Sequence, residues 1–315
     1  MARILVTRRL PDGGLGPLAG HEIVGPHVDD RPLTPTELAE QVGSCDAVVC
    51  LLTDRIDAAI IAAGAAGGRL RVIANVAVGY DNIDVAAARD HGIAVCNTPG
   101  VLDETTADLA FGLILAAARL ASTAEADLRA GRWSGWRITE YLGYDVHGAA
   151  LGLVGYGRIG RAVARRAAGF SMTVRHHTRR DTGEPGWVAD LDELLATSDI
   201  VSLHVPGGAG THHLIDARRI GLLRPTAVLV NTARGPVVDE AALAEALHAG
   251  RLFAAGLDVY EREPEIHPRL LTAPRTVLWP HLGSASHATR LRMATTATAA
   301  VAEILAGRTP TNVVP

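Results

Sequence analysis

The sequence predicts an α/β protein with two domains, each built on a parallel β-sheet. Three observations lead to this prediction. Short apolar runs alternate with helical patterns along nearly the whole chain. A glycine-rich motif, Gly152-Leu-Val-Gly-Tyr-Gly-Arg-Ile-Gly160, lies near the middle of the chain instead of at its start. The segment Asn97-Thr-Pro-Gly100 interrupts the alternation and has the composition of a hinge.

Composition limits the class of protein. The 315 residues are 48% hydrophobic and 20% charged, which is typical of a soluble globular protein of two domains. The formal net charge of −4 provides no basic surface for nucleic acid or acidic membranes. The N-terminus reads as a strand and not as a signal peptide, and no apolar run has the length of a membrane span. Three scattered cysteines and no convincing metal-ligand spacing favour a cytoplasmic protein with reduced thiols and no bound metal.

The first 98 residues alternate between strand and helix by themselves. Thr34 followed by Glu37 forms a capping box at the start of a helix. The predicted strands are Arg3–Thr7, Asp46–Leu52, Leu70–Val76 and Ile93–Cys96, and the predicted helices are Thr34–Val42, Asp57–Ala63 and Val85–Asp90. Because the glycine-rich motif begins only at Gly152, this half is a separate domain.

After a long apolar helix at Asp103–Leu120 and an irregular stretch at 130–144, six further strands alternate with helices. Six strands with crossover helices are sufficient for a complete dinucleotide-binding fold. The irregular stretch carries Trp133, Trp136, Tyr141 and Tyr144, and it is a subunit contact, a wall of a cleft or a local packing element. The predicted strands are Ala149–Val154, Met172–His177, Ile200–Val205, Ala227–Asn231, Phe253–Val259 and Thr276–Trp279; the predicted helices are Arg158–Ala168, Leu191–Ala196, Ala217–Leu222, Glu240–His248 and His287–Leu305.

The glycine-rich motif has a G-x-G-x-x-G spacing between a strand pattern and a helical pattern. The first glycine permits a tight turn, the second lets the backbone approach a pyrophosphate, and the third lets the helix pack closely on the strand. The pyrophosphate would lie on free N–H groups at the helix N-terminus. The alternative is a plain tight turn in a glycine-rich protein. The residues expected to contact the dinucleotide here are Gly155, Tyr156, Gly157, Arg158, Ile159 and Gly160.

The end of the second strand of this fold indicates which dinucleotide is bound. An acidic residue expected there in NAD enzymes would bind the ribose 2′-hydroxyl. Here Thr178 occupies the position, and Arg179 and Arg180 follow it. Guanidinium groups suit a 2′-phosphate, so we expect NADP(H) to be preferred, with NAD(H) possible. The alternative is that both arginines are solvated turn residues and that the enzyme takes either cofactor; Asp181, close by, is an acid that could oppose a phosphate.

Three ionisable residues follow the last three predicted strands, at the sheet edge where open α/β sheets bind ligands. Reduction of a 2-keto acid needs a cation for the carboxylate, a proton donor for the carbonyl oxygen and a hydride. Arg234 can bind the carboxylate and polarise the carbonyl group. His281 can donate the proton, because an imidazole with an unperturbed pKa of ~6.5 changes charge near neutral pH. Glu263 beside it would favour the imidazolium form.

These motifs together resemble the D-2-hydroxyacid dehydrogenase family, and most closely its glyoxylate/hydroxypyruvate reductase branch, over essentially the whole chain. The motifs are Asn75–Asp84, Asn97–Leu102, Gly131–Trp136, Gly152–Gly160, His204–Pro206, Asn231–Gly235, Leu257–Pro264 and Pro280–Ser286. The resemblance implies a Rossmann-like cofactor domain at 99–285. It also implies a flavodoxin-like, discontinuous substrate domain that closes as a lid, at 1–98 and 286–315.

The resemblance also assigns site residues. Arg234, Glu263 and His281 match the catalytic set, and Arg234 and His281 are substrate contacts as well. Further substrate contacts are Leu52, Val78 and Gly79; further cofactor contacts are Thr106, Val205, Pro206, Thr232, Ala233, Asp258 and Gly283. A homodimer formed through the cofactor domain, with the helix after the hinge and the tryptophan-bearing loop involved, is implied in the same way.

The expected activity is NADP(H)-dependent reduction of glyoxylate or hydroxypyruvate to the D-2-hydroxy acid. A short phosphoglycerate dehydrogenase and a reductase of bulkier 2-keto acids keep the same chemistry and stay open as alternatives. A nucleotide-sensing scaffold is the non-enzymatic alternative, and the intact set of Arg234, Glu263 and His281 argues against it. Related formate dehydrogenases carry an amide where this chain has Glu263, so they are disfavoured.

Overall fold

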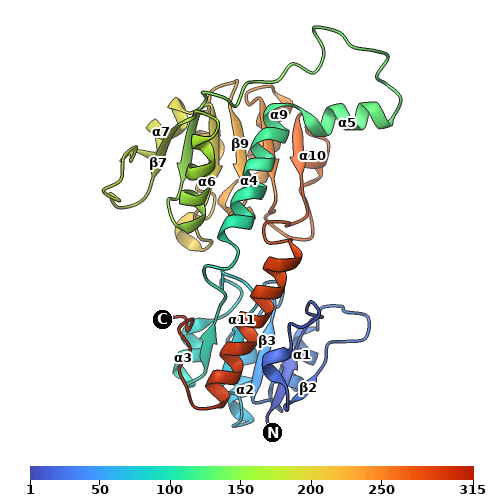
Figure 1. The fold of residues 1–315 in the computed structure, drawn as a ribbon, viewed down its shortest axis with the longest axis vertical. Coiled ribbons are helices and arrows are strands. Elements are labelled where there is room, and N and C mark those ends of the chain that lie inside the picture. Colours follow the sequence, from blue (N-terminus) through green and yellow to red (C-terminus); the bar gives the residue numbers. More distant parts are fainter. The chain divides into compact units, whose positions relative to one another are not determined.

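The computed structural model describes all residues, 1–315, and divides them into two compact units. Unit 1 consists of Met1–Leu102 and Ala285–Pro315, and unit 2 of Asp103–Ser284 (Figure 1). The domain boundaries expected from the sequence lie between residues 98 and 99 and between residues 285 and 286. The chain is an α/β protein with two parallel sheets, as predicted, and its last helix returns to the first unit.

The sheet of unit 1 has five parallel strands in the order β2-β1-β3-β4-β5. This is the flavodoxin-like order that was expected. Strands β3 and β4 are buried along their whole length, which explains why they are almost entirely apolar. The strands are β1 (Arg3–Val6), β2 (Glu22–Val24), β3 (Ala47–Cys50), β4 (Val72–Asn75) and β5 (Ala94–Cys96).

Helices cover both faces of this sheet. Alternate strand residues point to opposite faces, so Leu5 and Val48 pack under one helical layer while Ile4 and Val49 pack under the other. The first layer is α1 (Pro35–Val42), α2 (Ala58–Ala66) and α3 (Val85–Asp90); the second is α11 (His287–Leu305) with a short 3₁₀ turn, η1 (Gly16–Leu18). The predicted capping box of Thr34 and Glu37 is present at the start of α1.

Unit 2 has six parallel strands in the order β11-β10-β9-β8-β6-β7. The strand order reverses between β6 and β8, and such a switch point is where open α/β sheets bind ligands. The strands are β6 (Ala150–Val154), β7 (Thr173–His177), β8 (Ile200–Leu203), β9 (Val228–Asn231), β10 (Ala254–Leu257) and β11 (Thr276–Leu278). These strands are slightly shorter than the predicted ones, as Phe253–Val259 against Ala254–Leu257 illustrates.

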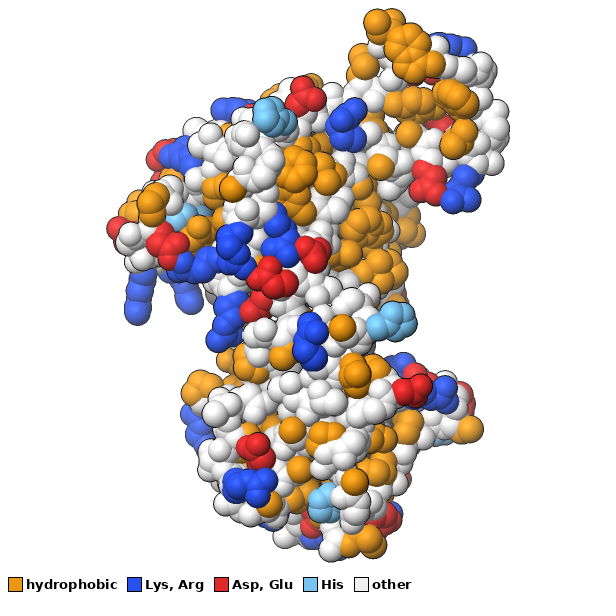
Figure 2. All heavy atoms as spheres, in the orientation of Figure 1, with side chains coloured by type: hydrophobic (Ala, Val, Ile, Leu, Met, Phe, Trp, Pro, Cys, Tyr) orange, Lys and Arg blue, Asp and Glu red, His pale blue; other side chains and the backbone are white.

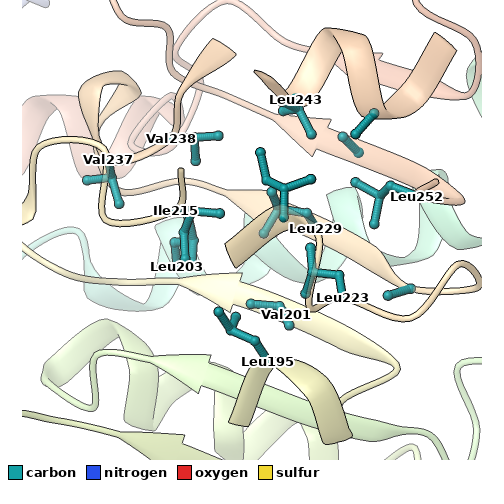
Figure 3. Close-up of a cluster of buried hydrophobic side chains, with 14 of the residues drawn as sticks. Leu195, Val201, Leu203, Ile215, Leu223, Leu229, Val237, Val238, Leu243 and Leu252 are labelled. Atoms are coloured by element: carbon teal, nitrogen blue, oxygen red, sulfur yellow. The ribbon is translucent and has the colours of Figure 1, made fainter. Parts of the chain in front are cut away.

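Two hydrophobic cores hold the helices of unit 2 against its sheet. One core contains α4 and α6. The other contains α7, α8, α9 and α10, with Leu195, Leu229 and Leu243 among its side chains (Figure 3). The helices are α4 (Asp103–Ala118), α5 (Ala121–Arg129), α6 (Arg158–Ala168), α7 (Leu191–Thr197), α8 (Ala217–Ile220), α9 (Glu240–His248) and α10 (Pro268–Leu271), with 3₁₀ turns η2 (Ala209–Thr211) and η3 (Gly235–Val237).

Apart from the 3₁₀ turns, three elements were not predicted, namely β2, α5 and the four-residue α10, and one predicted helix ends early. β2 has three residues, too few for an alternating pattern, and no residue of it is fully buried. The predicted helix Asp103–Leu120 ends at Ala118, because Leu120 takes a left-handed conformation with φ of 56°. α5 begins directly after it and buries none of its residues, so it lacks the apolar stripe that identifies a helix in a sequence.

The α5 arm, defined as residues 121–145, carries exposed hydrophobic side chains. In Figure 1 its loop extends away from the sheet of unit 2, and in Figure 2 hydrophobic side chains gather on it. Trp136 is 79% exposed, and Ile138 is 75% exposed. No single helix is long and apolar enough to cross a membrane. The pair α4 and α5 meets the criteria of length and composition only when the two are taken together across a 67° bend.

Candidate active site

The glycine-rich loop connects β6 to α6 at the switch point of the unit 2 sheet. Gly155 has φ of +95°, and a Cβ atom on it would lie 2.5 Å from the carbonyl oxygen of His204. A Cβ on Gly160 would collide with the carbonyl oxygen of Gly155. These two glycines are therefore required by the turn and by close backbone packing, the roles that the spacing predicted for the first and third positions.

Gly157 is different, because a Cβ on it would meet nothing within 4 Å. It is the N-cap residue of α6 and provides no side-chain hydrogen bond to the first turn. Arg158 follows it and is exposed. The open side of Gly157 and the uncapped N-terminus of an eleven-residue helix fit the pyrophosphate of a dinucleotide.

Buried polar atoms at the neighbouring strand ends also fit a ligand. The Oγ1 atom of Thr232 and the Nδ1 atom of His204 are buried and have no hydrogen-bond partner in the structure. Buried polar groups are normally paired, so a bound group that completes their hydrogen bonding would explain both. Burial lowers the pKa of His204 to about 4, so its imidazole is neutral at pH 7. The remaining predicted contacts at this edge, Val205, Pro206 and Ala233, directly follow β8 or lie beside Thr232.

The turn expected to bind the adenosine ribose follows β7, the edge strand of the sheet. Arg179 and Arg180 are exposed there. The hydroxyl group of Thr178 donates to the carbonyl oxygen of Arg180 at 2.6 Å, which shapes the turn. The Oδ1 atom of Asp181 accepts the N–H of Gly183 at 2.8 Å. The carboxylate that could oppose a phosphate is thus engaged in a local turn.

The three predicted catalytic residues follow three adjacent parallel strands. Arg234 follows β9, Glu263 follows β10 and His281 follows β11, so all three leave the sheet at its carboxyl edge. The structure brings Glu263 and His281 into contact. The charge of Arg234 also acts on the Glu263 carboxyl group, so the three belong to one electrostatic environment.

His281 and Glu263 form a hydrogen-bonded pair. The Nδ1 atom of His281 lies 2.7 Å from the Oε2 atom of Glu263, and the other carboxylate oxygen accepts the N–H of Tyr260 at 3.0 Å. Both side chains are little more than a quarter exposed. Burial raises the pKa of Glu263, but the hydrogen bond and charge of His281, together with the Tyr260 N–H and the charge of Arg234, hold it below its ordinary value. The carboxylate is therefore ionised at neutral pH.

Arg234 is positioned by a side chain that the sequence analysis did not single out. Asn231, the last residue of β9, accepts the N–H of Ala233 at 3.0 Å and donates to the carbonyl oxygen of Arg234 at 2.9 Å. An asparagine that bonds the backbone two or three residues later is a recognised turn signal. Its place at a strand end, before Thr-Ala-Arg-Gly, was the available clue.

The backbone under His281 is held by Asp258. Its carboxylate accepts the N–H groups of Leu282 at 2.6 Å and Gly283 at 2.8 Å, and Thr106 donates to the Gly283 carbonyl oxygen at 3.0 Å. His281 itself has φ of 55°. Burial raises the pKa of Asp258 to about 6, although the two backbone N–H groups and the charge of His281 oppose this rise. Three predicted cofactor contacts, Thr106, Asp258 and Gly283, thus form one cluster.

The predicted substrate contacts Leu52, Val78 and Gly79 lie in unit 1. Leu52 follows β3 and is 37% exposed. Val78 and Gly79 follow β4. The carbonyl oxygen of Gly79 accepts the side-chain amide of Asn75 at 2.8 Å, and that of Val78 accepts the amide of Asn97, also at 2.8 Å. Side-chain amides therefore fix the conformation of this loop.

A dinucleotide-binding sheet edge with a histidine–glutamate pair and an arginine defines a nicotinamide-dependent dehydrogenase. Comparison with known proteins identifies the particular group. Residues 111–283 match the family described as D-isomer specific 2-hydroxyacid dehydrogenase, NAD binding domain. The chain belongs to this family of NAD(P)-dependent enzymes, as its motifs predicted.

Relatives match nearly the whole chain. A glyoxylate reductase of Korarchaeum cryptofilum is 46% identical over 99% of this chain and 95% of its own. A protein of Thermus thermophilus of known structure is 43% identical, with a TM-score of 0.92, over 99% of this chain and 100% of its own. An NADPH-dependent glyoxylate/hydroxypyruvate reductase of Sinorhizobium meliloti, solved with NADP and malonate, is 33% identical, with a TM-score of 0.86. The match covers 99% of this chain and 96% of that protein.

Proposed function

We propose that this chain reduces a small 2-keto acid, glyoxylate or hydroxypyruvate, to the D-2-hydroxy acid, with NADP(H) preferred. The observation that carries the proposal is the His281–Glu263 pair at 2.7 Å, with Arg234 at the end of the adjacent strand. Relatives described as glyoxylate reductases, 40–46% identical over 93–99% of the chain, support the substrate class. A bound nicotinamide cofactor supplies the hydride.

The chain's own residues provide the rest of the chemistry. Glu263 occupies the Nδ1 side of His281, so the Nε2 atom is the one that can give its proton to the carbonyl oxygen of the substrate. The ionised Glu263 carboxylate stabilises the imidazolium that must be present before this transfer. Arg234 binds the substrate carboxylate through its planar guanidinium group, which orients the carbonyl carbon and favours charge that develops on its oxygen.

Cofactor preference follows from the turn after β7. Arg179 and Arg180 are exposed at the position where the 2′ group of the ribose is expected, and the carboxylate of Asp181 is engaged with the Gly183 N–H. A pair of guanidinium groups attracts a 2′-phosphate. The relative from Sinorhizobium meliloti, which is described as NADPH-dependent, supports the same preference.

We infer that two copies of the chain associate through unit 2, with the α5 arm in the contact. The arm exposes Leu128, Trp133, Trp136, Ile138, Leu142 and Tyr144. An exposed group of large hydrophobic side chains of this kind marks an interaction surface. Unit 1 is assigned as the substrate domain, with Leu52, Val78 and Gly79 as its contacts, on the family resemblance.

The experiment that tests the proposed activity is a set of initial rates. Glyoxylate, hydroxypyruvate, phosphohydroxypyruvate and a bulky aromatic 2-keto acid are each assayed with NADPH and with NADH. We expect the highest kcat/KM for one of the first two with NADPH. A highest value for the phosphorylated or the aromatic acid would replace the proposed substrate, and no reduction of any of the four would leave the chain as a nucleotide-binding scaffold.

A further inference from the structure

Two segments of unit 2 carry two of the three proposed catalytic side chains, Arg234 and Glu263, and lie against each other. The Arg234 segment, residues 234–240, runs from Arg234 through η3 to the first residue of α9, Glu240. The Glu263 segment, residues 260–267, follows β10 and carries Glu263. The contacts between them converge on Glu240, a residue that the chemistry described above does not use.

The carboxylate of Glu240 binds both ends of the Glu263 segment. The side chain is 5% exposed. Its Oε1 atom accepts the N–H of Glu261 at 2.6 Å, and its Oε2 atom accepts the N–H of His267 at 3.2 Å. A backbone N–H that loses its partner in a buried place carries a desolvation cost, so these two hydrogen bonds hold the segment in place. One buried carboxylate thus closes the loop on either side of Glu263.

A second hydrogen bond returns from the Glu263 segment. The Oε1 atom of Glu261 accepts the backbone N–H of Glu240 at 2.8 Å, and the same oxygen lies 3.1 Å from the Nε2 atom of His213. The two glutamates therefore exchange backbone and side-chain bonds. Such a reciprocal pair fixes the register of one segment against the other, because neither backbone can slide without losing both bonds.

The backbones themselves meet at Gly235. A Cβ atom there would overlap the carbonyl group of Tyr260, so only glycine permits this approach. The Tyr260 hydroxyl group donates to the carbonyl oxygen of Trp279 at 3.0 Å, two residues before His281. The joined segments are in this way also connected to the segment that carries the histidine.

The simplest explanation of Glu240 is that an acidic residue in the first turn of a helix interacts favourably with the helix dipole. The contacts of Glu240 are more specific than this explanation requires. A dipole interaction requires no burial and no specific partner. Asp239 already caps α9 by accepting the N–H of Ala242 at 2.9 Å. Val237, Val238 and Leu243 anchor this part of the chain in the core (Figure 3). Both carboxylate oxygens of Glu240 are committed instead to the segment that bears Glu263.

We propose that Glu240 is a positioning residue for catalysis: by holding both ends of the Glu263 segment, it sets the Glu263 carboxylate against the Nδ1 atom of His281 and fixes that pair relative to Arg234. The inference rests on the proposed roles of Glu263 and His281. In its proposed role, Glu240 contacts neither substrate nor cofactor and acts only by positioning other side chains.

The test is a double-mutant cycle between Glu240→Gln and Glu263→Gln. The amide of Glu240→Gln keeps one acceptor and turns a donor toward the other backbone N–H, so one end of the segment is released with little change in volume. We expect kcat to fall by about 10- to 100-fold, because small misplacements of reacting groups lower the rate by such factors. The Kd for NADPH should change by less than about twofold. The pH profile should shift in the direction that Glu263→Gln causes. Glu245→Gln, on the exposed side of the same helix, is the matched control.

In the Glu263→Gln background, Glu240→Gln should reduce kcat further by less than about threefold, because the group that it positions is already gone. Full additivity of the two losses, or an unchanged kcat in Glu240→Gln alone, would overturn the inference. If Glu240→Gln does not fold, Glu261→Ala, which removes the returning bond from a partly exposed side chain, enters the same cycle with the same expectation. If Glu263→Gln alone leaves kcat and the pH profile unchanged, the role proposed for Glu263 fails, and the inference about Glu240 fails with it. Failure of the proposed function is a different result, namely no reduction of the 2-keto acids by the wild type.

Discussion

The Nδ1 atom of His281 lies 2.7 Å from the Oε2 atom of Glu263, although 18 residues separate them in the chain. The contact exists because the two residues follow β11 and β10, which are adjacent parallel strands in register from Ala255 opposite Thr276. Parallel strands end at the same sheet edge, so residues that follow them converge. The pair links the topology of unit 2 to the proton transfer that we assign to it.

Replacing Glu263 with glutamine should change the pH dependence of reduction. The pKa of Glu263 is held below its ordinary value, so the wild-type carboxylate is negative at every pH above that value and stabilises the His281 imidazolium. Without this charge the Glu263–His281 pair loses its negative member, and the pH at which kcat for reduction declines should move down. Rates measured from pH 5 to pH 9 test this, with Glu265→Gln, an exposed residue of the same segment, as the control.

The same substitution has a consequence for folding. A carboxyl group whose folded-state pKa is lowered stabilises the folded protein above its unfolded value, near 4.5, and that contribution is lost as the pH falls through the lowered folded value. The difference in unfolding free energy between wild type and Glu263→Gln should therefore be largest at neutral pH and should shrink on acidification below about pH 4.5. A difference that grows on acidification would contradict the assigned sign.

Arg234→Ala should lower kcat/KM for a 2-keto acid by about 10²-fold or more, because a charged donor to the substrate carboxylate and carbonyl group is removed. Arg234→Lys keeps the charge but not the planar two-pronged geometry. We expect lysine to restore less than about a tenth of the lost kcat/KM. Wild-type rates in Arg234→Lys would show that a point charge is sufficient and that bidentate binding plays no part.

Replacing both Arg179 and Arg180 with alanine should weaken the binding of NADPH far more than the binding of NADH. The expected loss is about tenfold or more in the Kd for NADPH, and less than about twofold for NADH, because only NADPH carries the 2′-phosphate. Titration of each cofactor against the purified protein measures both values. Arg175→Ala, on β7 itself, controls for the loss of an arginine, because Arg175 is bound to Glu193 and Thr197. Equal losses for the two cofactors would remove the argument for NADP(H).

Trp136→Glu should disrupt association of two copies. The side chain is 79% exposed on the α5 arm, and a carboxylate within an apolar contact costs the energy of its desolvation. Sedimentation should give the mass of two chains for the wild type and of one chain for the variant at low concentration. Val28→Glu changes an equally exposed hydrophobic residue in unit 1 and should leave the mass unchanged. A single-chain mass for the wild type would contradict the proposed dimer.

Several helices were predicted with their correct first and last residues. α6, α9 and α11 have the bounds that the sequence indicated, and the capping box at Thr34 is present. β2 and α5 were missed for opposite reasons: the strand is too short to show a pattern, and the exposed helix has no apolar face. Local pattern detects elements that are buried on one side, because burial produces the pattern.

The proposed catalytic residues of the site could be predicted because ionisable residues that follow apolar strands are recognisable in the sequence. Arg234, Glu263 and His281 were identified because each follows an apolar strand. The left-handed backbone of His281, the turn bonds of Asn231 and the two-ended contact of Glu240 depend on packing between distant segments. A glutamate after an N-cap aspartate is common at helix starts, so nothing in the sequence distinguishes Glu240 from a solvated one.

The most direct measurement of the central claim is kcat for NADPH-dependent glyoxylate reduction by wild type and His281→Ala at neutral pH, with the Kd for NADPH determined on the same samples. The account predicts that kcat falls by about 10²-fold or more while the Kd changes by less than about twofold, because the imidazole donates a proton and binds no part of the dinucleotide. A kcat within about threefold of the wild-type value would contradict the assignment of His281 as the acid of this reaction.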